Sequence, residues 1–253
     1  IYASFCEYAE MGMGNLPGYP YMQCCIITYK TYPERNRIET LLSTKWNQTS
    51  PFNSSDPRGR DLGCTTIAAG QIMRYHKFPQ LYPGTGLVID WDSMPDNTSN
   101  TVLSDFLYGL RTDIGVDDGG GATINEAKRA LADYGYSCEI ISHSTSRVYS
   151  QLADGNPVYM RGTDPATGVG HAWVCDGFYT STSITEYNLY VLEFKSQGVP
   201  FRMALHDTER IYSPGLLYYH MNWGWGGSRD GYFWENNSSL NYSANRKDML
   251  ISK

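Results

Sequence analysis

The chain has 253 residues, of which 41% are apolar and 18% charged. This apolar content excludes a disordered or low-complexity protein, because enough surface can be buried to offset the entropy cost of folding. Twenty Lys and Arg against 26 Asp and Glu give a net charge of −6, so we expect neither nucleic acid nor an anionic membrane as a partner. No segment approaches the ~20 consecutive apolar residues that a membrane-spanning helix requires.

The first segment, residues 1–37, contains many Tyr, Pro and Gly and little periodicity. We expect it to be an N-terminal extension or the remnant of a pro-segment, and residues 38–253 to form the main domain. A start at Ile1 without a charged and apolar leader favours an extracellular protein whose signal segment has been removed. The six Cys show no metal-ligand spacing, so no metal or other cofactor is expected.

Four segments have apolar residues at helical spacing. The segment Cys64–His76 follows Gly63 and is ended by Lys77-Phe78-Pro79. The last of the four segments opens with a capping box formed by Thr123 and Glu126. The expected helices are Arg37–Trp46, Cys64–His76, Val102–Leu110 and the segment that begins at Thr123 and stops at Gly135.

Beyond about residue 157 the pattern changes to β-rich runs separated by Gly, Pro and Asp. Helices followed by antiparallel strands predict an α+β fold, and we expect two lobes with a cleft between them. The expected strands are Pro157–Arg161, His171–Asp176, Asn188–Phe194, Phe201–Leu205, Leu216–Asn222 and Tyr232–Trp234.

Cys64 is the candidate nucleophile, because it opens the expected buried helix. The positive end of the helix dipole favours the thiolate, which is expected to lower the thiol pKa below its usual ~8.5. The alternative is an inert buried cysteine, and the presence of a base within reach decides between the two.

His171 is the candidate base, because it stands where Gly168-Val169-Gly170 gives way to a strand that can fix its backbone beside a cleft. Cys175 lies on the same strand face but ~13 Å away, so it cannot be the partner. His76 is ~18 Å from Cys64 along their common helix and is expected to cap the helix C-terminus.

The remaining histidines are weaker candidates. His143 and His206 lie in polar contexts that are typical of the solvated surface, and His220 is the runner-up base. After it, Asn222 can accept a hydrogen bond from an imidazole N–H, which the adjacent Trp223 can shield from water. Core packing of these Trp residues is an open alternative.

A thiolate that attacks a carbonyl forms an oxyanion, which requires hydrogen-bond donors already in place. The backbone N–H of Cys64 is one candidate donor, and the side-chain amide of Gln48 is the other. An isolated Gln would default to the surface. The order Gln, Cys on a helix, His on a strand, then Asn-Trp favours the catalytic interpretation.

Three motifs resemble those of the streptopain family of bacterial cysteine peptidases, a branch of the papain-like fold. Residues Gly63–Pro79 resemble its nucleophile helix, Gly170–Gly177 its histidine motif and His220–Gly227 its tryptophan motif. Trp46–Asn53 is similar to its oxyanion-glutamine stretch, and the resemblance extends from about residue 38 to 234.

The resemblance implies a papain-like peptidase domain in which the helical lobe carries the nucleophile, the antiparallel β lobe carries the histidine and the cleft lies between. It implies Cys64 as nucleophile, His171 as general base and then acid, and Gln48 in the oxyanion hole. It also implies that Trp223 and Trp225 flank the imidazole, and that the substrate backbone contacts Gly170 and the Gly119–Ala122 segment, with Gly120, Gly121 and Ala122. The family is secreted as a zymogen, inhibited by its pro-segment, and uses no metal.

The chain departs from the family pattern in two places beyond its N-terminal segment. An extra stretch at about Tyr179–Tyr212 is expected to be a hairpin that covers or extends the cleft, and Asn236-Asn237-Ser238-Ser239 replaces a glycine-rich loop. The sequence predicts an extracellular or cell-surface endopeptidase that acts on polypeptides. The open alternatives are a Cys-His acyltransferase or peptidoglycan amidase, and an inactive papain-like module that binds glycans or proteins.

Overall fold

The computed structural model describes residues 23–194, 200–234 and 242–253. The chain divides into two compact units: one combines residues 1–36 with 180–216, and the other combines residues 37–179 with 217–253. All of the predicted site residues lie in the second unit. The first 22 residues of the expected N-terminal extension, and the Asn236–Ser239 replacement loop, lie outside the described residues.

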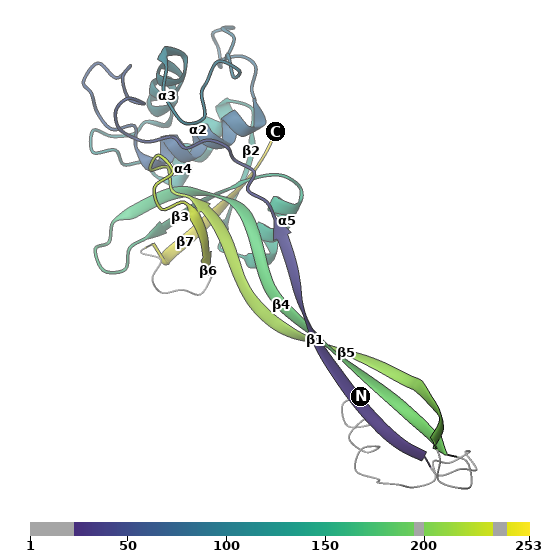
Figure 1. Ribbon diagram of the computed structural model, residues 1–253. Helices are drawn as coiled ribbons and strands as arrows, with labels where there is room; N and C mark the ends of the chain where they lie inside the picture. The colour runs from purple at the N-terminus through teal and green to yellow at the C-terminus, as the bar shows by residue number, and fades with distance from the viewer. Residues whose placement is uncertain (1–22, 195–199, 235–241) are drawn as a thin grey trace. The chain divides into compact units, whose positions relative to one another are not determined.

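The fold is α+β, as predicted. In chain order the elements are β1 (Gln23–Ile38), α2 (Cys64–His76), α3 (Thr101–Ile114), α4 (Ile124–Asp133), β2 (Ser137–Ser142), α5 (Thr145–Ala153), β3 (Val158–Thr163), β4 (Gly170–Phe194), β5 (Pro200–Asn222), β6 (Gly231–Trp234) and β7 (Ala244–Ser252) (Figure 1). The sheet has the order β2-β7-β3-β4-β5-β6, and β1 pairs with β4. The pairs β2·β7, β3·β7, β3·β4 and β5·β6 are antiparallel.

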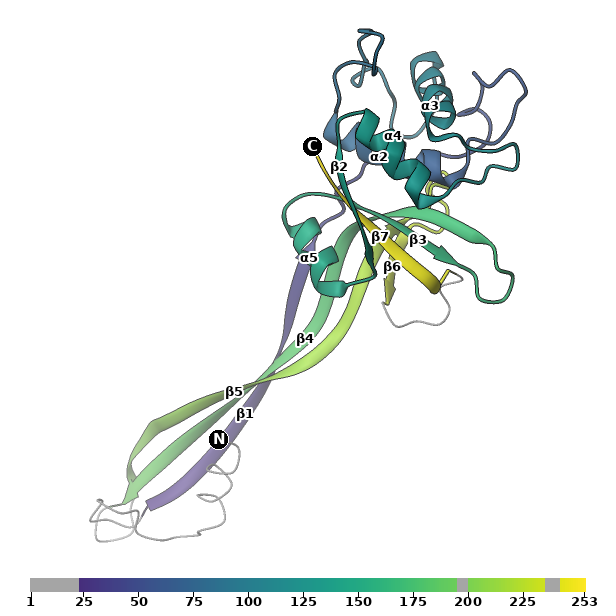
Figure 2. The same cartoon turned by 180° about the vertical axis from the view of Figure 1, so that it is seen from behind.

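The second unit has an apolar core on each face of its sheet, because successive strand residues point to opposite faces. Helices α2, α3 and α4 gather on one side (Figure 2), where Tyr159 of β3 and Val174 of β4 belong to their core. On the other face, Met160 and Trp173 pack with Val148 of α5. Successive residues along β3 and β4 thus contribute alternately to the two cores.

Helix α2 has the predicted bounds, and it is buried on nearly all sides. Its sequence of Ile, Ala, Thr and Met therefore fits a helix enclosed between α3 and the sheet rather than one that exposes a polar face. The chain leaves the helix through Lys77 in the left-handed conformation. The capping box of Thr123 and Glu126 is also present, at the start of α4.

The helix expected at Arg37–Trp46 is wrong. Strand β1 continues to Ile38, and the backbone amides of Leu41 and Leu42 then donate to the backbone carbonyl and side chain of Asp176. The apolar residues that suggested a helical stripe are divided between the two cores, with Leu41 on one face and Leu42 on the other. Strands β1, β2 and β7 and helix α5 were not predicted.

The first unit contains residues 23–36 of β1, 180–194 of β4 and 200–216 of β5. Within it, the Thr182 hydroxyl donates to the Glu34 carbonyl at 3.0 Å, and Arg210 pairs with Glu186 at 3.0 Å. Strands β4 and β5, which contain the described residues of the Tyr179–Tyr212 stretch, are hydrogen-bonded neighbours in the sheet. That this stretch covers or extends a cleft stays a prediction. Among the helices of the described chain, none is long and apolar enough to span a membrane.

Candidate active site

Cys64 occupies the first position of α2, directly after Gly63. Gly63 has φ +83°, and a Cβ there would lie 2.6 Å from the Gly120 carbonyl oxygen. Glycine is required at this position for both reasons, since any side chain would strain the backbone and push the Gly120 segment away from the helix. The start of the helix and the Gly119–Ala122 segment are therefore in direct contact.

The Cys64 thiol lies near the backbone of Ala172, the residue that follows His171. The first residue of α2 is therefore close to the start of β4, where His171 lies. Burial raises the pKa of the Cys64 thiol, although hydrogen bonds with Ala172 and Thr65 act in the opposite direction. The expectation of a lowered thiol pKa is therefore wrong, because desolvation outweighs the favourable end of the helix.

His171 is buried, and its Nε2 lies 3.0 Å from the Trp223 carbonyl oxygen. A carbonyl can only accept, so Nε2 carries the hydrogen and donates it. In the neutral imidazole, Nδ1 then carries the lone pair and is the basic atom. Burial lowers the pKa of His171 to about 4, against the smaller opposing effect of the Trp223 hydrogen bond.

Four aromatic rings surround the imidazole. Trp225 lies 4.8 Å from it between ring centroids and Tyr242 4.9 Å, while Trp223 and Trp173 lie at 6.0 and 6.1 Å. Both Trp residues that were expected to flank the histidine do so. The rings exclude water from the Nε2–H bond to Trp223, which strengthens that bond.

Asn222 does not accept the imidazole proton, contrary to the sequence expectation. Its Oδ1 accepts from Gln71 Nε2 at 3.0 Å and from the Gly224 N–H at 3.1 Å, and its Nδ2 donates to the Thr44 carbonyl at 2.8 Å. The main-chain carbonyl of the next residue, Trp223, accepts the hydrogen bond from the imidazole instead. A sequence pattern cannot distinguish these two acceptors, because they belong to adjacent residues of the same loop.

The backbone of Gln48 is bonded to the chain that leads into α2. Its carbonyl accepts from the Leu62 N–H at 2.9 Å, two residues before Cys64. The preceding Asn47 forms an isolated bridge with Trp225. Gln48 is half-buried, and its backbone is thus fixed both to the chain that enters α2 and to the loop beside the imidazole.

The Gly119–Ala122 segment is held from α3. The Asp117 carboxylate accepts from the Gly121 N–H at 2.8 Å. The buried Arg111 donates to the Asp117 carbonyl at 2.6 Å and to the Asp61 carbonyl at 3.0 Å. One guanidinium therefore links the segment to the chain that leads into Cys64. Gly170, the first residue of β4, pairs with Thr163 of β3 and is exposed.

Tyr242 was not predicted. Its ring contacts His171, and burial together with the nearby Cys64 raises the pKa of its phenol. The contact requires glycine at position 162, where a Cβ would lie 2.0 Å from the Tyr242 carbonyl oxygen. A tyrosine outside any motif, in a chain with 21 of them, carries no signal, although Gly162 within a strand indicates a close backbone approach.

The other histidines differ from the expectations in two cases, His76 and His143. His76 does not act as a charged helix cap, because burial lowers its pKa to about 4. His143 is not a surface residue and pairs with the buried Asp248 at 2.8 Å. The runner-up base, His220, pairs with Asp176 at 2.6 Å. His206 is exposed, as expected.

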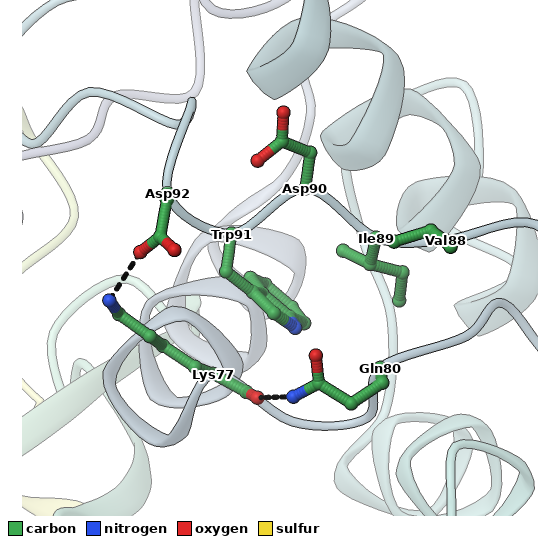
Figure 3. A pocket seen from close by; sticks show the side chains of 7 residues that line it. All are labelled: Lys77, Gln80, Val88, Ile89, Asp90, Trp91 and Asp92. Carbon is green, nitrogen blue, oxygen red and sulfur yellow. Dashed lines mark hydrogen bonds and ion pairs between the residues drawn. The ribbon is translucent and has the colours of Figure 1, made fainter.

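A hollow of about 620 Å³ lies beside the C-terminal end of α2, and Figure 3 shows its lining. It contains none of the predicted site residues. Its polar groups have partners: Lys77 pairs with Asp92, Asp90 accepts from the Ser93 N–H at 3.2 Å, and the Trp91 indole donates to the Pro79 carbonyl at 2.7 Å. No group of three Cys, His, Asp or Glu side chains arranged for a metal occurs in the part of the chain that the structure describes.

A cysteine at the start of a helix and a histidine at the start of a strand are the two residues that a cysteine peptidase requires. Residues 46–233 match the Peptidase C10 family, and the protein belongs to it. The expected streptopain relationship is thereby confirmed.

Known relatives agree with this assignment. The chain is 28% identical to the thiol protease/hemagglutinin PrtT of Porphyromonas gingivalis over 76% of its length and 23% of that protein, and 22% identical to streptopain of Streptococcus pyogenes over 78% and 55%. It thus spans about a quarter and about half of these two relatives. The fold is similar to that of a fragment of prointerpain A from Prevotella intermedia, with a TM-score of 0.53 and 22% identity over 84% of this chain and 71% of the other.

Proposed function

We propose that the protein is a papain-like cysteine endopeptidase that cleaves polypeptides, with Cys64 as nucleophile and His171 as general base and acid. The observation that supports this proposal is the proximity of the Cys64 thiol to the backbone of Ala172, the residue after His171. The Nε2 of His171 is bonded to the Trp223 carbonyl, so Nδ1 is the atom that can accept the thiol proton.

The reaction begins with both groups neutral, since burial raises the thiol pKa and lowers that of the imidazole. The sulfur attacks the peptide carbonyl as its proton moves to Nδ1, and a tetrahedral oxyanion forms. The Cys64 N–H and the Gln48 side-chain amide stabilise this oxyanion. The imidazolium is stabilised by the Trp223 carbonyl.

The intermediate collapses as the imidazolium gives its proton to the leaving amine, and a thioester with Cys64 remains. Water then attacks the thioester, His171 takes the water proton and later returns a proton to sulfur, and the carboxylic acid product leaves. Gly170 and the segment with Gly120, Gly121 and Ala122 bind the substrate backbone, and Trp225 covers the imidazole. The substrate lies in a cleft between a helical lobe with Cys64 and a β lobe with His171.

The wider setting of this activity is also a proposal. The peptidase domain comprises residues 38–253, and residues 1–37 are an extension or a pro-segment remnant. The protein acts outside the cell, as is expected from the streptopain resemblance, and a pro-segment inhibits it before activation.

Two substitutions test the assignment. Cys64→Ala and His171→Ala should each abolish casein cleavage, with unchanged far-UV circular dichroism, because each removes one member of the proton-transfer pair. A thiol-directed epoxide should label Cys64 in the unmodified protein, and much more slowly in the His171→Ala variant. Cys138→Ala is the matched control, since Cys138 is also free and partly buried but lies in β2. Retained cleavage in either catalytic variant contradicts the proposal.

The same preparations separate the alternatives. An acyltransferase would incorporate a labelled amine into casein, and an amidase would act on peptidoglycan but not on casein. An inactive binding module would show neither cleavage nor fast labelling of Cys64.

A further inference from the structure

Gln71 is a fully buried amide on the helix that carries Cys64. The two residues are seven positions apart, nearly two turns at ~3.6 residues per turn, so they share one face of α2. Gln71 Oε1 accepts from the Trp46 N–H at 3.3 Å, and its Nε2 donates to Asn222 Oδ1 at 3.0 Å. The amide thus bridges the segment that leads to Gln48 and the loop that supports His171.

A continuous series of hydrogen bonds connects this amide with the imidazole. Asn222 Oδ1 also accepts from the Gly224 N–H at 3.1 Å. That N–H belongs to the same peptide group as the Trp223 carbonyl, which accepts from His171 Nε2 at 3.0 Å. The peptide group between Trp223 and Gly224 is therefore bonded at both ends, to Asn222 through its N–H and to His171 through its carbonyl.

The orientation of each amide in this series is determined by a backbone group that can form only one kind of bond. The Trp46 N–H can only donate, so Gln71 must direct Oε1 toward it and Nε2 toward Asn222. Asn222 must then direct Oδ1 toward Gln71, and its Nδ2 reaches the Thr44 carbonyl, which can only accept. With Asn222 in this orientation, the Gly224 N–H has an acceptor.

We propose that Gln71 is a positioning residue for the His171 imidazole, acting through Asn222 and the peptide group between Trp223 and Gly224. A peptide N–H that is already bonded makes its own carbonyl a stronger acceptor, because successive hydrogen bonds polarise one another. The benefit is greatest when His171 carries the proton taken from Cys64. The inference rests on the proposed function, since it requires that His171 becomes protonated during the reaction.

The Gln71 amide also positions Trp46 and Asn47, the two residues that precede Gln48. The Trp46 carbonyl accepts from the Gly226 N–H at 3.0 Å, and the next residue, Asn47, bridges to Trp225. Gln71, on the helix that carries the proposed nucleophile, therefore helps to hold residues 46–47 against residues 225–226. One buried side chain connects the three parts of the site, and it touches neither the substrate nor the reacting atoms.

Two variants of Gln71 separate positioning from simple packing. Gln71→Met keeps the length of the side chain but forms neither bond, and it should lower kcat about tenfold or more with little change in KM, because a displaced imidazole affects the chemical step. Gln71→Glu keeps the shape. Burial should keep its carboxyl group protonated at low pH, where the O–H donates to Asn222 and the carbonyl accepts from Trp46.

The Gln71→Glu variant should therefore approach the activity of the unmodified protein at acidic pH and lose it as the pH rises, because the carboxylate has no proton to donate to Asn222. Gln151→Met is the matched control: Gln151 of α5 also donates from Nε2, to the Ile251 carbonyl at 2.8 Å, but it has no connection with His171. This control should retain kcat. Each variant is measured on a peptide substrate from pH 4 to 9, with thermal unfolding recorded alongside.

An unchanged kcat in Gln71→Met overturns the inference. So does a Gln71→Glu profile that parallels that of the unmodified protein, since a purely structural role would not introduce a new titration. Failure of the proposed function is recognised separately, because Cys64→Ala would then retain peptide cleavage. If Cys64→Ala is inactive and Gln71→Met is fully active, only the positioning role is wrong.

Discussion

Burial determines the protonation of the two proposed catalytic residues, Cys64 and His171. The pKa of His171 is about 4, and that of Cys64 lies above its usual value. A neutral imidazole is required to accept the thiol proton, and it is available only above the His171 pKa. We expect kcat/KM to be nearly constant from about pH 5 to pH 8, to fall as the pH drops through about 4, and to fall again only above the raised thiol pKa. Initial rates on a peptide substrate from pH 3 to 10 check this.

Acid unfolding must be excluded in that experiment. His76 and His171 both have a pKa of about 4 in the folded protein and bind a proton near pH 6.5 when unfolded. Between these values the unfolded state binds more protons, so stability also decreases as the pH falls. Tryptophan fluorescence at each pH identifies the folded range. An acidic limb near pH 6.5 in folded protein would mean that the imidazole is solvated in the free enzyme.

At the scale of elements, α3 holds the proposed substrate-binding segment through Arg111. Its guanidinium donates to the carbonyls of Asp61 and Asp117, and both lose their donor in Arg111→Met. Because each is a hydrogen bond to a charged group, we expect the free energy of unfolding to fall by roughly 2–4 kcal/mol. KM should rise more than kcat falls, since the Gly119–Ala122 segment is loosened rather than the catalytic pair. Urea unfolding and peptide kinetics measure the two effects.

Arg129 provides the control for this prediction. It also donates to a backbone carbonyl near the end of α3, that of Ile114 at 3.0 Å, but it projects from α4 and is exposed. Arg129→Met should change the unfolding free energy by less than about 1 kcal/mol and leave KM unchanged. Equal losses in the two variants would show that Arg111 has no particular role in holding the segment.

Elements whose pattern is local could be predicted from the sequence. Helix α2 was predicted correctly because Gly63 and Pro79 limit a continuous apolar pattern, and the start of α4 was predicted because its capping box involves only neighbouring residues. The Arg37–Trp46 segment was not, because its backbone amides bond to Asp176 and Asp96, far along the chain. Tertiary contacts of this kind override local propensity.

The candidate site was predictable to the same extent. Cys64 and His171 are marked by their places at a helix start and a strand start. The acceptor for His171 was assigned to Asn222 instead of Trp223, because main-chain carbonyls leave no trace in a sequence. The roles of Gln71, Arg111 and Tyr242 depend on contacts between distant segments. For the same reason, the sequence indicates a lowered pKa for Cys64, whereas burial raises it.

At the scale of the whole molecule, the second unit contains both apolar cores and every proposed catalytic residue. The first unit contains none of the proposed catalytic residues. The rings of Tyr179 and Tyr218 lie 5.7 Å apart, so β4 and β5 are neighbours where the units divide. A two-residue Asn-Gly turn can join such strands. A shortened protein can therefore be made in which an Asn-Gly turn replaces residues 180–216 and residues 1–36 are removed.

We expect this shortened protein to fold and to cleave a short peptide substrate with kcat/KM within about threefold of the full chain, because the bonds around Cys64 and His171 are all retained. The cleavage of casein, measured in parallel, shows whether the first unit contributes to the binding of large substrates. A second version with a Gly-Gly turn controls for the choice of linker, and Cys64→Ala in the shortened protein gives the background rate. A shortened protein that is folded by circular dichroism but inactive on the peptide would contradict this expectation, and would show that cleavage requires residues of the first unit.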